Sequence, residues 1–83
     1  MKVSLILTVK NENDSVDAFF NSLINQSIKP DEIIIVDAGS NDGTYEKLLN
    51  YTNIFSNLSI ISEPGCNRSQ GRNIAIKKAK YDI

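Results

Sequence analysis

The chain has 83 residues, nine basic and ten acidic, which gives a formal net charge of −1, and 41% of the residues are apolar. This length suits one small domain, which we expect to span residues 1–83, and it is too short for two. With this balance and no basic run beyond Lys77-Lys78 with Lys80, the electrostatic footprint is poor for nucleic-acid binding, so we expect no nucleic-acid partner. The absence of histidine and the single Cys66 exclude an internal disulfide and a thiolate zinc site.

The N-terminal apolar run, residues 3–9, bears on the cellular location. It is too short and too interrupted to cross a membrane, and no small-residue cleavage site follows it. With one thiol and no secretion signal, we expect a cytoplasmic protein. For a full-length form of the protein, the cytoplasmic face of a membrane is the alternative location.

The first predicted strand, residues 3–9 (VSLILTV), is a nearly continuous apolar run rich in β-branched residues. Such runs are typical of a strand that is covered on both faces, as in a parallel sheet. A helix follows, with Asn13 or Asp14 as the expected N-cap and an end near Gln26. Its apolar residues recur at helical spacing and predict one buried face: Val16, Phe19, Phe20, Leu23 and Ile24.

The second predicted strand, residues 32–37 (EIIIVD), is again a buried run. Residues 38–43 (AGSNDG) combine two glycines with serine, asparagine and aspartate, a composition that predicts a loop. Thr44 is then the expected cap of a second helix. The buried face of that helix is predicted to carry Tyr45, Leu48 and Leu49.

The third predicted strand, residues 58–62 (LSIIS), leads into a Pro-Gly turn. Ser69 is the expected cap of a third helix that runs through Lys80. Residues 81–83 are predicted to begin a fourth strand. The order β-α-β-α-β-α therefore predicts a parallel, Rossmann-like α/β sheet with helices on both faces, a three-layer sandwich.

Ligands of open parallel sheets bind beyond the carboxyl ends of the strands. Three polar loops, residues 9–14, 37–43 and 63–72, are predicted to meet there. Carboxylates in the first two can accept from a nucleobase N–H or a ribose hydroxyl, and arginines in the third suit phosphate. The pattern indicates a nucleotide pocket, although no G-x-G-x-x-G turn or G-x-x-x-x-G-K-[ST] loop is present.

Three segments carry a resemblance to a known family. Residues 3–12 (VSLILTVKNE) are similar to the opening strand and "NE" turn of family 2 glycosyltransferases. Residues 32–44 (EIIIVDAGSNDGT) resemble the second strand and the "VDDGSTDGT" loop of that family, and residues 71–76 (GRNIAI) resemble its "ARN-G/A" segment. The three segments occur in the family's order and cover essentially the whole chain.

The resemblance implies a GT-A fold and a sugar donor activated by a nucleoside diphosphate. By the same resemblance, Thr8, Glu12 and Asp37 match positions near the nucleobase and ribose, and Arg72 matches a position near the base or diphosphate. Lys10 stands where the family has an aromatic residue, and we include it in the predicted nucleotide-binding set. Ala38 replaces the second acid of the family's usual pair, which removes one expected nucleobase contact.

The resemblance also places the family's Asp-x-Asp-like metal motif at the end of a fourth strand, beyond Ile83. A full-length enzyme would then use Mg²⁺ or Mn²⁺ to bridge the diphosphate oxygens. The family's catalytic base comes later still. We therefore expect the present chain, a truncated GT-A domain on this interpretation, to hold no metal and to be inactive in transfer by itself.

Plainer interpretations stand beside these. Glu12 suits a solvated turn equally well, and Arg72 could pair with Asp37 or Asp42. As a whole, the chain could be a non-catalytic nucleotide-binding or oligomerisation module.

The first strand would lack a neighbour on one side, and an open edge tends to pair with another chain, so we expect a homo-oligomer through residues 3–9.

Overall fold

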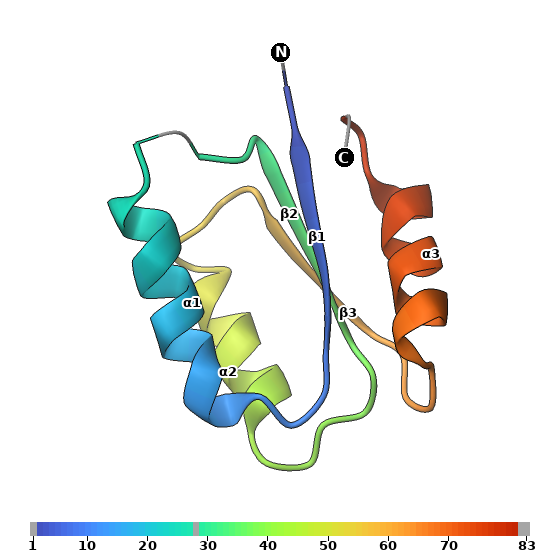
Figure 1. Cartoon of the computed structure of the whole chain (residues 1–83). Helices are drawn as coiled ribbons and strands as arrows, with labels where there is room; N and C mark the ends of the chain where they lie inside the picture. The colour runs from blue at the N-terminus through green and yellow to red at the C-terminus, as the bar shows by residue number, and fades with distance from the viewer. Residues whose placement is uncertain (1, 28, 82–83) are drawn as a thin grey trace.

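A computed structural model describes residues 2–27 and 29–81 as three strands that alternate with three helices (Figure 1). The elements are β1 (Ser4–Val9), α1 (Asn13–Asn25), β2 (Glu32–Asp37), α2 (Thr44–Tyr51), β3 (Leu58–Ser62) and α3 (Arg68–Lys78). The predicted order is confirmed, and so are the bounds of the second and third strands. Of the predicted fourth strand, Tyr81 lies in a bend, and residues 82 and 83 lie outside the described residues.

The strands form one parallel sheet in the order β1-β2-β3. Ile34 of β2 lies beside Ile6 of β1, and Ile35 lies beside Ile60 of β3. Every residue of β2 is buried. This agrees with its unbroken apolar sequence, because a central parallel strand is covered by helices on both faces.

Helices α1 and α2 cover one face of the sheet and α3 covers the other, which confirms the three-layer architecture (Figure 1). Successive β2 side chains point to opposite faces and supply two separate cores. The core under α1 and α2 contains Val9, Val16, Phe20, Leu23, Ile33, Ile35, Leu48 and Leu58. The smaller core under α3 contains Ile34, Val36 and Ala75.

The predicted starts of α1 and α2 were wrong. Glu12 occupies the N-cap position of α1 without a capping side-chain bond, and the predicted caps Asn13 and Asp14 lie in the first turn. Gly43 precedes α2 at a φ of 93°, and the predicted cap Thr44 is the first helical residue. Both helices are capped instead by one side chain from the loop before α2, described below.

The predicted bounds of α3 were also wrong at both ends. Asn67, rather than Ser69, is the N-cap. It forms a capping box in which its side chain accepts from the Gln70 N–H and the Gln70 side chain accepts from the Asn67 N–H. The helix ends at Lys78, not Lys80, because the backbone becomes extended at the C-cap position.

Two residues predicted on buried helix faces are largely exposed. Ile24 of α1 is 49% exposed and Leu49 of α2 is 40% exposed. A three-stranded sheet covers only a narrow stripe of each helix, and that stripe is filled by Phe20, Leu23 and Leu48. Within residues 2–27 and 29–81, the structure has no helix that combines the length and the apolar character needed to cross a membrane.

Candidate functional site

A cavity of about 610 Å³ lies along β1, between the first turns of α1 and α3. Its floor is formed by residues 6–9 of β1 and is largely apolar. Its polar side chains come from all three elements and from the turn after β1: Thr8, Glu12, Ser15, Arg68, Ser69 and Arg72. The cavity therefore presents two guanidinium groups and one carboxylate around an apolar floor.

Three of the five predicted nucleotide-binding residues line this cavity. Thr8 is half-buried in its floor, and the exposed Glu12 and Arg72 stand on opposite walls. Lys10 is exposed beyond the end of β1 and is not part of the lining, and neither is Asp37. The structure thus brings Thr8, Glu12 and Arg72 together at the cavity. It leaves the other two predicted residues, Lys10 and Asp37, outside the lining.

Asp37 ends β2 as a buried carboxylate with 1% exposure. Its Oδ1 accepts from the N–H of Gly39 at 3.0 Å and from the N–H of Ser40 at 2.8 Å, so it fixes the turn that follows β2. Its Oδ2 is buried and has no hydrogen-bond partner among the described residues. Because an unsatisfied buried acceptor is costly, this oxygen would gain from any donor that reached it.

The predicted set of five left out three polar residues of the lining, of which Arg68 and Ser69 belong to the third polar loop and Ser15 to none of the three. Arg68 precedes Arg72 by four positions, so both lie on one face of α3, and this spacing could have revealed the pair. Ser69 adds a hydroxyl from the same turn. Ser15 lies in the first turn of α1, and nothing in its sequence context separates it from an ordinary solvated serine.

The loop after β1 is tied to the loop after β2 through Asn11. Its N–H donates to Ser40 Oγ at 2.8 Å, and its Oδ1 accepts from the Asn41 N–H at 2.9 Å. Asn11 has a φ of 54°, a left-handed conformation that asparagine tolerates better than most residues. The tie fixes the position of Glu12, the next residue, relative to the loop that Asp37 shapes.

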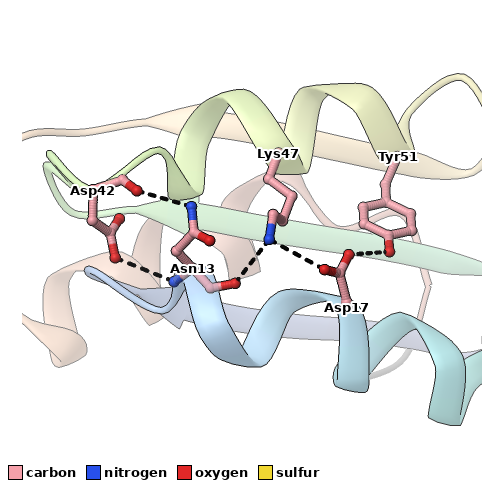
Figure 2. Close-up of polar contacts among 5 residues, drawn as sticks. All are labelled: Asn13, Asp17, Asp42, Lys47 and Tyr51. Atoms are coloured by element: carbon pink, nitrogen blue, oxygen red, sulfur yellow. Dashed lines mark hydrogen bonds and ion pairs between the residues drawn. The ribbon is translucent and has the colours of Figure 1, made fainter.

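Asp42 caps two helices at once, and Figure 2 shows its contact with Asn13 at the start of α1. Its Oδ2 accepts from the N–H of Asn13 at 3.2 Å, at the start of α1. Its Oδ1 accepts from the N–H of Thr44 at 3.1 Å and from the Thr44 hydroxyl, at the start of α2. The Thr44 hydroxyl is the main cause that holds the pKa of Asp42 below its ordinary value. One side chain therefore replaces both missing caps.

A second polar group joins α1 to α2 further along (Figure 2). Lys47 Nζ donates to the carbonyl of Asn13 at 3.2 Å and lies 3.1 Å from Asp17 Oδ2. The Tyr51 hydroxyl donates to Asp17 Oδ1 at 2.5 Å. This hydrogen bond is the main cause that lowers the pKa of Asp17 and raises that of Tyr51. An exposed ion pair adds little stability, so the main effect of this group is to position α1.

The carboxylates do not fit a divalent metal. Over residues 2–27 and 29–81, no three histidine, cysteine, aspartate or glutamate side chains are close enough together to hold an ion. Asp37 and Asp42 are both committed to backbone N–H groups. No catalytic step through a metal follows from these residues.

Residues 4–83 match the family model described as Glycosyl transferase family 2. The chain belongs to this family. It is 34% identical over 79 residues to the cholesterol galactosyltransferase of Borreliella burgdorferi, covering 95% of this chain and 22% of that protein. It is also 34% identical over 84 residues to the poly(ribitol-phosphate) beta-glucosyltransferase of Bacillus spizizenii, covering 96% of this chain and 13% of that protein.

The fold of this family 2 glycosyltransferase domain is shared with a solved enzyme. The mannosyltransferase PcManGT from Pyrobaculum calidifontis, in complex with GDP-Man and Mn²⁺, superposes with a TM-score of 0.83 at 21% identity. The match covers 95% of this chain and 24% of that one. The predicted GT-A, Rossmann-like fold is thereby confirmed, and this chain spans about a quarter or less of each of these three glycosyltransferases.

Proposed function

We propose that this glycosyltransferase domain binds the nucleoside-diphosphate part of a sugar donor in the cavity along β1, for transfer of the sugar to an acceptor hydroxyl. The observation that carries the proposal is the convergence of Thr8, Glu12 and Arg72 on one cavity of about 610 Å³, with Arg68 beside them. A cavity of this size suits a ligand of nucleotide dimensions.

The chemistry of the lining supports a diphosphate and a ribose. Arg68 and Arg72 present planar guanidinium groups from the start of α3, where the helix dipole also favours an anion. The Glu12 carboxylate can accept from ribose hydroxyls, and the Thr8 hydroxyl can donate or accept. Asp37 lies outside the lining, and its Oδ1 holds the turn after β2 through the N–H groups of Gly39 and Ser40. Lys10 would act at the outer rim.

The relatives support the same substrate class. PcManGT was solved in complex with GDP-Man and Mn²⁺, and the two relatives from Borreliella burgdorferi and Bacillus spizizenii are named for galactosyl and glucosyl transfer. We propose a divalent metal for the complete active site by analogy with that complex. Since the described residues offer no ligand set, nucleotide binding by this chain is proposed to be independent of metal.

A second candidate is an oligomerisation module, with or without nucleotide. Its support is the position of β1 at one end of the described sheet, where no described strand pairs with its outer side. An open strand edge favours pairing with another chain. We propose self-association through β1.

Calorimetric titration with UDP, GDP and dTDP, each with and without Mn²⁺, tests the nucleotide proposal. We expect one nucleotide to bind without metal, and Arg72→Ala to weaken it about tenfold or more, as loss of a charged hydrogen bond does. Lys29→Ala, which removes an equal charge outside the cavity, is the matched control. No binding by a folded chain, or equal weakening by both variants, would contradict the proposal.

A further inference from the structure

The charged residues of this domain are segregated across the sheet. Helix α3 has four basic residues and no acidic residue, whereas α1 has two acidic residues and no basic one. Lys80 follows α3, and Lys2 lies beside the same end with its Nζ 5.3 Å from the centre of the Tyr81 ring. Figure 1 shows that α3 stands alone on its face of the sheet, opposite α1 and α2. The domain therefore has one distinctly basic face.

The basic face has two parts with different surroundings. Arg68 and Arg72 lie at the start of α3 and line the cavity. The rest, which we name the lysine patch, lies at the other end of the helix and consists of Lys2, Ile76, Lys77, Lys78 and Lys80. In the described part of the chain, the one salt bridge joins Lys47 to Asp17, so no lysine of the patch is neutralised by a carboxylate.

An apolar side chain lies within the patch. Ile76 is 40% exposed, is followed directly by Lys77, and lies four residues before Lys80. Two described carboxylates lie near the patch: the buried Glu32 accepts from the Lys80 N–H, and the exposed Asp31 accepts from the N–H of Val3, directly after Lys2. Ile76 and Lys77 are about 100° apart around the helix axis, so the aliphatic side chain lies beside the cationic ones, a pairing that suits the boundary between anionic headgroups and acyl chains.

We propose that the lysine patch docks this domain on an anionic lipid surface. The patch carries four lysines, while the acidic α1 and the uncharged-on-balance α2 lie on the far side of the sheet. Nucleic acid fits this face less well, because α3 has no aromatic side chain for base stacking and the Tyr81 ring after it already has Lys2 Nζ 5.3 Å from its centre. The proposal goes beyond the nucleotide site and does not depend on it.

Co-sedimentation with vesicles tests the proposal. The chain is mixed with phosphatidylcholine vesicles, with or without about one-third phosphatidylserine, at low and physiological salt. We expect binding to the anionic vesicles that weakens as salt is added and is absent with phosphatidylcholine alone. Each lysine near an anionic surface changes the partition coefficient about fivefold, so Lys77→Ala with Lys80→Ala should lower it about twenty-five-fold.

The matched control is Lys10→Ala with Lys29→Ala, which removes the same charge from two exposed positions outside the patch. We expect it to change the partition coefficient about twofold or less. Circular dichroism verifies that each variant is folded. Failure to bind anionic vesicles, equal loss in both double variants, or preferential binding of a single-stranded RNA added as competitor would overturn the proposal.

Discussion

Gly71 fixes the distance between α3 and β1. A Cβ built on Gly71 would stand 2.6 Å from both Cγ2 and Oγ1 of Thr8, closer than real Cβ atoms approach other atoms. Thr8 is β-branched, so its side chain cannot easily rotate out of the way. Because Arg72 follows Gly71 directly, this close approach also sets where the guanidinium group stands over the cavity floor.

The contact predicts energetic coupling between the two positions. We expect Gly71→Ala to destabilise the protein, because overpacking costs about 1–3 kcal/mol and outweighs the gain of up to about 1 kcal/mol in helix propensity. In a protein that already carries Thr8→Ala, the two clashing atoms are absent. Gly71→Ala should then leave the free energy of unfolding unchanged or raise it. Urea unfolding of the wild type, the two single variants and the double variant should give a coupling free energy of about 1–3 kcal/mol.

A matched cycle with Asn73→Ala controls for the α3 position, since Asn73 is exposed on the same helix. Its effect should be additive with that of Thr8→Ala to within about 0.5 kcal/mol. If the Gly71 cycle were additive too, α3 would be free to shift away from β1, and the proposed role of Gly71 would be wrong.

At the scale of elements, the strands could be predicted from sequence and the helix caps could not. The strands are continuous apolar runs, and burial on both faces is the physical cause of that pattern. The cap of α1 comes from Asp42, 29 residues beyond Asn13, and sequence-local capping rules cannot find such a contact. Asp42 serves both helices because their first turns lie side by side at the same end of the sheet.

Glu32 links three elements at the opposite end of the sheet. Its Oε1 accepts from Ser4 Oγ at 2.7 Å and from the Lys80 N–H at 2.8 Å, and Ser4 Oγ accepts from the Tyr81 N–H at 3.2 Å. These bonds connect the starts of β1 and β2 to the segment after α3. The Lys80 N–H, and then the Ser4 hydroxyl, hold the pKa of Glu32 below its ordinary value of 4.5, although burial opposes them.

The lowered pKa of Glu32 predicts a loss of stability in acid. The carboxylate stabilises the folded state fully above its unfolded pKa of 4.5, and this contribution disappears as the pH falls through the lower folded pKa. Urea unfolding over a pH series should therefore show a falling free energy of unfolding below about pH 4.5. Glu32→Gln should remove only part of this pH dependence. Asp17 and Asp42 also have lowered pKa values, so they contribute the rest. Equal slopes for both proteins would contradict this account.

For the whole molecule, the sequence located the region of the site and not its full composition. Parallel topology alone places the loops after β1 and β2 at one end of the sheet, and the family resemblance selects residues within them. Thr8, Glu12 and Arg72 converge as predicted because β1 and α3 are in contact. Asp37 lies outside the cavity lining, and its carboxylate is engaged by the turn that follows it, a local contact that the strand pattern does not reveal.

The open side of β1 makes self-association testable at single amides. The Val3 carbonyl accepts from the Glu32 N–H and the Val9 carbonyl from the Ala38 N–H, so by alternation the N–H groups of Ile6 and Thr8 point to the edge that no described strand pairs. If two chains pair there, light scattering should show dimers as concentration rises, and hydrogen exchange at these two amides should slow in parallel. Ile60, which by the same alternation points outward from β3, is the internal control and should exchange at a constant rate. A stable monomer at high concentration would remove the case for pairing. A dimer in which Ile6 and Thr8 still exchange rapidly would instead place the interface elsewhere on the molecule.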